Sequence, residues 1–269
     1  MPVILVGAFG LLIGSFLNVV IFRVPAGRSL IAPASACGSC GTPIRPWDNV
    51  PVLSWIFLRA RCRDCGASIS LRYPLVELGT ALFFATVAFR FGPGLVGPVG
   101  PINALIILPA FLYFASISVA LALIDLDTHR LPNSLVLPSY VVGLVLLGAA
   151  GGIGNDLGPI LRGALGLCIL WAVYLVLALA VPGGMGFGDV KLAGVIGLFL
   201  GYLGWGELAV GAFAAFLLGG IFALGLVAAK RANRKSAIPF GPWMLAGAWV
   251  GVFFGATVWD GYLNLLGMA

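Results

Sequence analysis

Long apolar runs dominate this sequence and constrain its fold more than any other feature. A helix needs about 20 apolar residues to cross the hydrocarbon core of a bilayer, and only helices or closed barrels satisfy their backbone groups there. Charged residues make up only 9% of the chain, whereas soluble domains average about 25%. We therefore expect an all-α polytopic membrane protein with about eight transmembrane helices. The expected spans are 2–22, 74–92, 102–124, 134–153, 160–182, 190–204, 207–229 and 240–259.

The basic residues fall almost entirely on one side of this eight-span arrangement. The 23–73 segment and the loops on its side hold most of the lysines and arginines, and the other side receives Arg90 and Arg162. An excess of Lys and Arg marks the cytoplasmic side of a membrane protein. We therefore expect segment 23–73 in the cytoplasm and both termini outside. For the same reason we attribute the net charge of +6 to the membrane topology of the chain. The expected partner is the lipid bilayer rather than nucleic acid.

Four of the five cysteines lie in segment 23–73, as Cys37-x-x-Cys40 and Cys62-x-x-Cys65 with 21 residues between the pairs. This spacing is typical of a four-cysteine zinc site. Zinc is favoured over two disulfides because disulfides rarely persist in the cytoplasm. Cysteine fills all four positions and leaves no open coordination site, so we expect a structural rather than a catalytic metal ion.

The chain therefore divides into three expected units. Residues 1–22 form the first transmembrane helix, residues 23–73 form a small cytoplasmic zinc-binding loop between the first two membrane helices, and residues 74–269 form a membrane-embedded domain of about seven helices. The fifth cysteine, Cys168, stands in an apolar run, where a free cysteine is expected to be a small buried core residue.

Three aspartates are placed at the cytoplasmic ends of expected spans. Asp125 and Asp127 follow the third span, and Asp189 opens the sixth within Gly186-Phe187-Gly188-Asp189. Two carboxyl groups held close together cannot both ionise cheaply, so one keeps a proton. The ionised group can then act as a base on water while the protonated one donates to a carbonyl oxygen. This pattern indicates peptide hydrolysis by a pair of aspartates at the membrane surface.

Other interpretations of the same residues remain open at this point. A proton-coupled transporter would also carry membrane carboxylates, although nearer mid-membrane, and a non-catalytic scaffold could dock a partner through its zinc loop. Lys191 is interpreted as a cytoplasmic anchor and His129 as a loop-surface residue. The residues alone do not decide between Asp125 and Asp127 as the partner of Asp189.

Several segments, taken in order, resemble the signatures of one known family, the type IV prepilin peptidases. The resemblance covers nearly the whole chain. The segments are Gly14–Ile21 in the first span, the two cysteine pairs, Pro51–Trp55, Ser70–Glu77, Asp125 with Leu131-Pro132, Gly186–Asp189, and Pro239-Phe240-Gly241-Pro242.

The resemblance implies a function and assigns roles to residues. It implies a membrane aspartic endopeptidase of the bacterial inner membrane that removes the leader of prepilins or pseudopilins on the cytoplasmic side. It further implies that the new N-terminal residue is methylated with S-adenosylmethionine. The aspartate seven residues before the proline is the family's catalytic one, so Asp125 and Asp189 are implied as the catalytic pair and Asp127 as auxiliary. Domain 74–269 would then be the peptidase domain.

Overall fold

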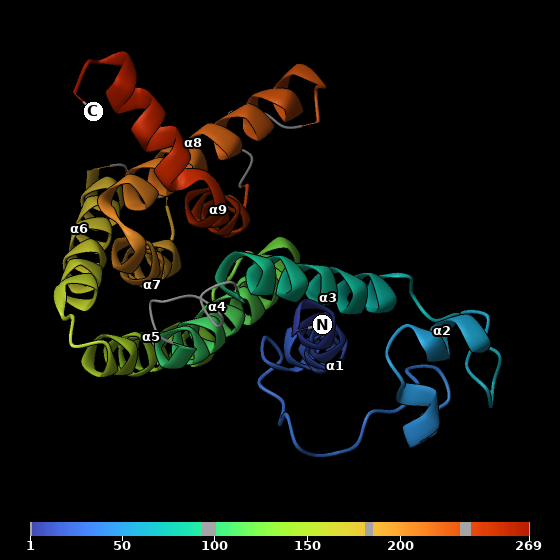
Figure 1. Ribbon diagram of the computed structural model, residues 1–269. Coiled ribbons are helices and arrows are strands. Elements are labelled where there is room, and N and C mark those ends of the chain that lie inside the picture. The colour runs from blue at the N-terminus through green and yellow to red at the C-terminus, as the bar shows by residue number, and fades with distance from the viewer. Residues whose placement is uncertain (1, 93–100, 181–184, 232–237, 269) are drawn as a thin grey trace.

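The computed structural model describes residues 2–92, 101–180, 185–231 and 238–268. Within these residues the regular structure is helical, apart from two isolated β-bridges in the loop after the first helix. Figure 1 shows the helices in chain order. They are α1 (Pro2–Arg23), the 3-10 helix η1 (Pro46–Asn49), α2 (Leu53–Phe57), α3 (Arg72–Phe91), α4 (Pro101–Thr128), α5 (Asn133–Ile153), α6 (Gly158–Ala180), α7 (Phe187–Leu203), α8 (Trp205–Ala228) and α9 (Gly241–Leu265).

The expected all-α multi-pass architecture is confirmed. Among the described residues, seven helices are long and apolar enough to cross a membrane: α1, α3, α4, α5, α6, α8 and α9. The expected span 190–204 corresponds to α7, which has 17 residues and is shorter than the roughly 20 that a bilayer requires. Helix α7 differs from the other long helices in being short and in packing against helices on several sides.

Helix ends depart from the expected spans at two functionally relevant places. Helix α4 continues to Thr128, so Asp125 and Asp127 belong to its last turns rather than to the loop after it. Helix α9 begins at Gly241 and runs six residues beyond its expected end, to Leu265. The last residues of the expected span 160–182 lie outside the described part of the chain.

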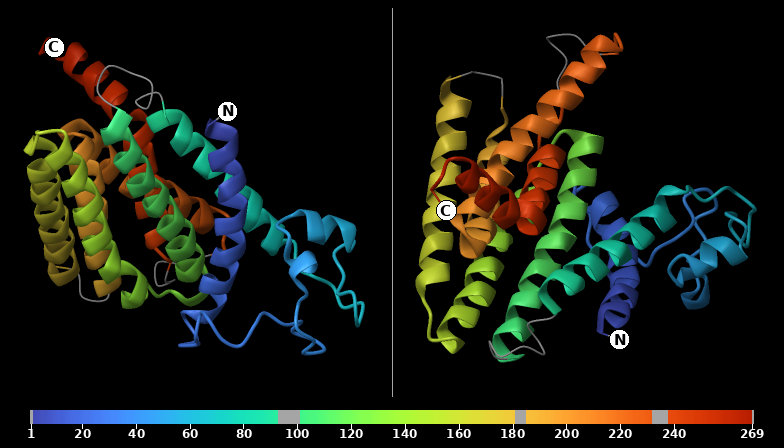
Figure 2. Two further views of the ribbon diagram at one scale, coloured as in Figure 1. Left: turned by 60° about the horizontal axis from the view of Figure 1, so that its bottom comes forward. Right: turned by 45° about the horizontal axis from the view of Figure 1, so that its top comes forward.

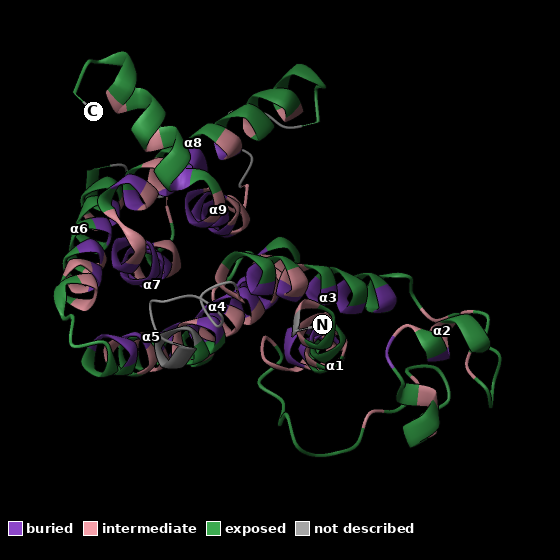
Figure 3. Cartoon of the chain, viewed as in Figure 1, coloured by how far each residue is buried: buried purple, intermediate pink, exposed green. Residues whose placement is uncertain are grey.

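Helix α7 forms the centre of the packed core. Residues 192–202 are all buried, and Figure 3 shows α7 largely in the colour of buried residues. The helix packs against α5, α6, α8 and α9, and its Phe199 ring stacks on Phe114 of α4 with centroids 4.5 Å apart. Glycines permit the close approach to α6, because a Cβ on Gly201 would lie 2.8 Å from the Arg162 carbonyl oxygen.

The far end of α7 is fixed by a single arginine. The Arg162 guanidinium of α6 donates hydrogen bonds to the carbonyl oxygens of Gly201, Tyr202 and Leu203, at 2.8, 2.9 and 3.1 Å. These carbonyls are among those that a helix C-terminus leaves without an intrahelical partner, and a cation there complements the helix dipole. Arg162 therefore anchors α7 at the end opposite Asp189.

The N-terminal helices form a second packed unit. Helix α1 lies close against α3 because Gly10 and Gly14 face the backbone of Ala81 and Glu77, where a Cβ would lie 2.8 and 2.6 Å away. The four-residue spacing of Gly10 and Gly14 thus lets the two helices pack closely along one face. Asn18 adds a hydrogen bond from its Nδ2 to the Tyr73 carbonyl oxygen at 3.2 Å.

The loop between α1 and α3 projects beyond the ends of these helices, as Figures 1 and 2 show. Within it the described helices are limited to the short η1 and α2, as expected for a segment interrupted by prolines. One polar contact ties it to α3: the Val52 N–H donates to Glu77 Oε2 at 2.7 Å, and Glu77 is buried. The expectation for Cys168 as a buried core residue is wrong, because this residue is exposed on α6.

Candidate active site and metal cluster

Asp125 lies three residues before the end of α4 and is buried, with 5% of its surface exposed. Its Oδ2 accepts a hydrogen bond from the Gly241 N–H at 3.0 Å. Gly241 is the first residue of α9, so the carboxyl group faces a helix N-terminus, where free N–H groups carry partial positive charge. Within the Pro239-Phe240-Gly241-Pro242 segment, Gly241 thus supplies the backbone donor that holds Asp125.

Asp189 occupies a matching position on α7. It is the third residue of the helix, and its Oδ2 accepts the Gly186 N–H at 3.0 Å while its own N–H donates to the Gly186 carbonyl oxygen at 3.0 Å. This reciprocal pair is a capping box in which the backbone of glycine replaces the usual serine side chain. Each of the two aspartates is therefore oriented by one backbone N–H group at the start of a helix.

The two carboxyl groups line the same cavity. It has a volume of about 410 Å³ and lies at the ends of α4 and α7. The loop after α4 contributes Leu131 and Pro132, and the segment after α1 contributes Val24 and Pro25. Sequence reasoning missed this last contribution, because nothing in an apolar pair of residues indicates what it packs against. The cavity therefore has a carboxyl group from each of two helices in its wall.

The two glycines before Asp189 have different surroundings. Gly188 packs closely against a side chain, since a Cβ on it would lie 3.1 Å from the Leu131 Cβ. A Cβ on Gly186 would lie 3.4 Å from Asp189 Oδ2, which is ordinary van der Waals contact. Gly188 therefore allows the loop after α4 to close on α7 and so brings the two carboxyl groups to one cavity.

Basic side chains also line this cavity. Lys191 donates from its Nζ to Asn133 Oδ1 at 2.9 Å and lies over the Phe187 ring, 5.1 Å from its centroid. His129 and Arg130 belong to the same lining, and both are exposed. The prediction of His129 as a surface residue is confirmed, but it lies at the cavity rather than away from it.

Asp127 is not part of this lining. Its two carboxylate oxygens accept hydrogen bonds from Arg72 at the start of α3, at 3.0 Å from Nη1 and 2.6 Å from Nη2. The structure thus separates the two aspartates that sequence reasoning could not distinguish by depth. Of the two, Asp125 shares the cavity with Asp189.

The four cysteines of the loop converge as the spacing predicts. The Sγ atoms of Cys37, Cys40, Cys62 and Cys65 all lie within 4.8 Å of one another, and those of Cys37 and Cys65 are 3.8 Å apart. Four sulfurs at about 2.3 Å from a tetrahedral zinc ion would be about 3.8 Å apart. The donor set therefore fits a tetrahedral metal ion. Backbone N–H groups of Cys40 and Ser39 lower the pKa of Cys37 to about 6, which favours the thiolate that metal ions bind.

The two halves of the cluster are built in the same way. The Cys37 and Cys62 N–H groups bind the carbonyl oxygens of Thr42 and Ala67, and the carbonyl oxygens of the same two cysteines accept the Gly41 and Gly66 N–H groups. Both glycines have φ of +73°, a conformation that a side chain disfavours. The sequence signal for this repeat is the glycine after each second cysteine, which the cysteine spacing alone did not reveal.

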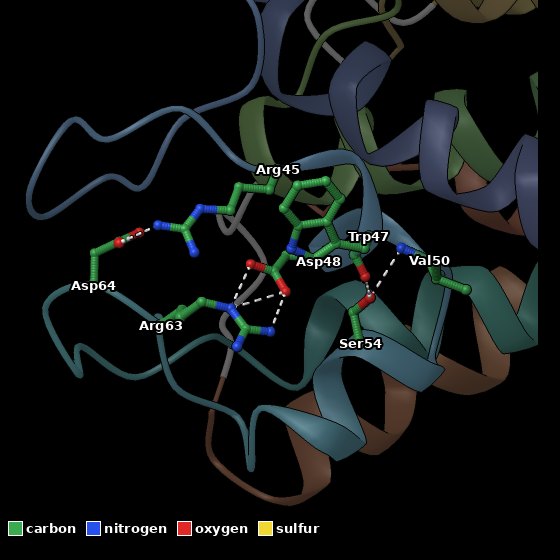
Figure 4. A network of polar contacts seen from close by, with 7 residues as sticks. All are labelled: Arg45, Trp47, Asp48, Val50, Ser54, Arg63 and Asp64. Atoms are coloured by element: carbon green, nitrogen blue, oxygen red, sulfur yellow. Dashed lines mark hydrogen bonds and ion pairs between the residues drawn. The ribbon is translucent and has the colours of Figure 1, made fainter.

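Ion pairs join the two halves of the cysteine loop, as Figure 4 shows. Arg63 pairs with Asp48 at 2.6 Å, and Arg45 pairs with Asp64 at 3.0 Å. Hydrogen bonds from Arg63 hold the pKa of Asp48 below its usual range. Ser54 donates to the Trp47 carbonyl oxygen and accepts the Val50 N–H. Because this loop exposes most of its surface, such polar links and the four-cysteine cluster take the place of an apolar core.

Two families match this chain. The family described as the bacterial peptidase A24 N-terminal domain matches residues 8–91, and the type IV leader peptidase family matches residues 112–224. A protein of Aeromonas salmonicida (strain A449) named prepilin leader peptidase/N-methyltransferase is 36% identical over 97% of this chain and 94% of its own length. Proteins of the same name from Pseudomonas aeruginosa and Neisseria gonorrhoeae are 35% and 34% identical, over 96% and 95% of this chain and 92% and 91% of their own lengths. No solved structure matches the chain significantly.

Proposed function

Because this chain belongs to the type IV leader peptidase family, we propose that it removes the leaders of prepilins or pseudopilins by aspartic catalysis, with Asp125 and Asp189 as the catalytic pair. The relatives that match nearly the whole chain carry the name prepilin leader peptidase/N-methyltransferase. The observation that carries the assignment of residues is that both carboxyl groups line one cavity.

The arrangement supports general acid–base hydrolysis. One carboxylate takes a proton from water as the water oxygen attacks the scissile carbonyl carbon, and the protonated carboxyl group gives its proton to the carbonyl oxygen. The tetrahedral intermediate then collapses as its C–N bond breaks: the carboxyl group that took the water proton gives it to the departing amine, and the hydroxyl proton of the intermediate returns to the other carboxylate. In the described part of the chain, backbone N–H groups bind only Oδ2 of each aspartate, which leaves Oδ1 for water and substrate.

We place the reaction on the cytoplasmic side of a bacterial inner membrane. The aspartates share their side with the cysteine loop and with most of the lysines and arginines, and an excess of basic residues favours the cytoplasm. With α7 as an eighth span, both termini then lie outside. This orientation brings the cavity to the side where newly made prepilins carry their leaders.

Zinc and S-adenosylmethionine are the two cofactors of this proposal. Cys37, Cys40, Cys62 and Cys65 would hold zinc, which with four cysteine ligands supplies folding stability rather than chemistry. The N-methyltransferase in the names of the relatives supports methyl transfer from S-adenosylmethionine to the N-terminus that cleavage creates.

Cleavage of a purified prepilin by the purified protein in detergent or nanodiscs tests the catalytic pair. Asp125→Asn and Asp189→Asn should each lower the cleavage rate by about 10²- to 10⁴-fold, the contribution typical of a general acid or base. Asp260→Asn is the matched control, because in the described part of the chain the Asp260 carboxylate makes no hydrogen bond or ion pair, and the side-chain contact at this residue is to its backbone carbonyl oxygen. Wild-type cleavage by Asp189→Asn protein would contradict the assignment.

A further inference from the structure

Arg72 and Asp127 form an ion pair between two parts of the chain that match different families. Arg72 opens α3 within residues 8–91, and Asp127 lies in the last turn of α4 within residues 112–224. Both carboxylate oxygens of Asp127 are bound, each by one guanidinium nitrogen. Such a two-point contact fixes orientation as well as distance. The other ion pairs found among the described residues lie within the cysteine loop.

The position of Asp127 on α4 relates it to Asp125. Two residues correspond to about 200° of rotation around an α-helix, so side chains two positions apart lie on nearly opposite faces. Asp127 therefore faces α3, while Asp125 faces the Gly241 N–H of α9. Holding Asp127 against α3 fixes the rotation of the last turns of α4 and so determines where the Asp125 carboxyl group points.

The N-terminal part of the chain also completes the cavity. Val24 and Pro25, just after α1, line it together with Asp125 and Asp189. The start of α3 is joined to α1 by the hydrogen bond from Asn18 to the Tyr73 carbonyl oxygen. Arg72, the neighbour of Tyr73, is thus connected to the wall that α1 supplies.

We propose that Arg72 and Asp127 are positioning residues, which hold the last turns of α4 and the Asp125 carboxyl group in place against the N-terminal segment that completes the substrate cavity. The proposal rests on the proposed function. Both side chains are 43–44% exposed, and exposed ion pairs contribute little to global stability. Breaking the pair should therefore change the cleavage rate far more than it changes thermal unfolding.

A double-mutant cycle on prepilin cleavage by the full chain tests the pair. Arg72→Ala and Asp127→Ala should each lower kcat by about tenfold or more, since small displacements of reacting groups are costly. The double variant should be no slower than the slower single variant, because both changes remove one interaction. Arg72→Lys keeps the charge but not the two-point geometry, so its kcat should lie between those of wild type and Arg72→Ala. Wild-type rates in both single variants, or losses that multiply in the double variant, would overturn the proposal.

Hydrogen exchange supplies a readout that does not depend on activity. Loss of the pair should speed amide exchange in peptides covering residues 121–131, with unchanged zinc content and melting temperature. Arg90→Ala is the control, because Arg90 is exposed at the opposite end of the same helix. If the wild-type protein does not cleave prepilin, the proposed function is wrong. The role of the Arg72–Asp127 pair in holding α4 is then tested by amide hydrogen exchange alone. Unchanged exchange in Arg72→Ala protein would show that the pair does not hold α4.

Discussion

Gly241 positions the carboxyl group of Asp125 through its backbone, although it has no side chain. Its N–H binds Asp125 Oδ2, and a Cβ at this position would lie 2.7 Å from that oxygen and 3.3 Å from Leu131 Cδ2. The first of these separations is shorter than real Cβ contacts allow. Asp125 therefore reaches the start of α9 only because the residue there is glycine. Its φ is not positive, so the requirement is for space rather than for an unusual backbone conformation.

Gly241→Val should lower prepilin cleavage by roughly 10- to 100-fold, because the added methyl groups displace the Asp125 carboxyl group from its N–H donor. The melting temperature should change much less than the rate. Gly261→Val is the matched control on the same helix, where a Cβ meets no neighbouring atom. Equal rates for the two variants would mean that contact with Gly241 does not position Asp125.

At the scale of elements, α7 is defined by packing rather than by length. Its glycines face those of α6, so that a Cβ on Gly197 would overlap the backbone of Gly166 and lie 2.9 Å from the Leu167 Cα. Tyr140 of α5 donates from its hydroxyl to the Lys191 carbonyl oxygen in the first turns of α7. Close contact on several sides fixes α7 and hence the position of Asp189 at its start.

Gly197→Val should destabilise the protein by about 1–3 kcal/mol, the usual cost of forcing extra groups into a packed interior. The measurement is thermal unfolding in detergent, with Gly220→Val of α8 as control, because a Cβ on Gly220 has open space around it. A melting temperature that falls no further for Gly197→Val than for the control would contradict close packing of α6 on α7.

For the whole molecule, the cysteine loop is an appendage to the helices rather than part of their core. It projects to one side of α1 and α3 (Figure 2), and most of its residues are exposed. The buried Glu77 carboxylate and the Val52 N–H make one polar link between the loop and α3. The loop and the helical core are therefore expected to lose their structure separately.

Cys37→Ser should lower the zinc content of the purified protein and speed proteolysis within residues 23–71, because four-cysteine loops depend on their metal for folding. The melting temperature of the helical core should remain close to that of wild type. Metal analysis and limited proteolysis provide the measurements, and Cys168→Ser on α6 is the control. Full zinc content in the Cys37→Ser protein would argue against one site built from all four thiols.

Local patterns were sufficient to predict the multi-pass helical fold and the four-cysteine cluster. Apolar runs and close cysteine spacing act over short distances along the chain, where the covalent backbone already limits the geometry. The motif pattern also allowed Asp125 and Asp189 to be proposed together. The end of α4 was placed too early because the helix continues through polar residues that the hydropathy pattern treats as loop.

Sequence by itself determined that this chain is a multi-pass helical protein with a four-cysteine loop and family-typical aspartates, because each of these features is encoded in contiguous segments. Tertiary structure alone decided which backbone N–H group binds each aspartate of the proposed catalytic pair. It also decided that Asp127 pairs with Arg72 outside the cavity, and that Val24 and Pro25 complete the cavity wall. These contacts join residues that lie up to 116 positions apart. They depend on how the helices pack and rotate against one another, which the pattern of any single segment does not specify.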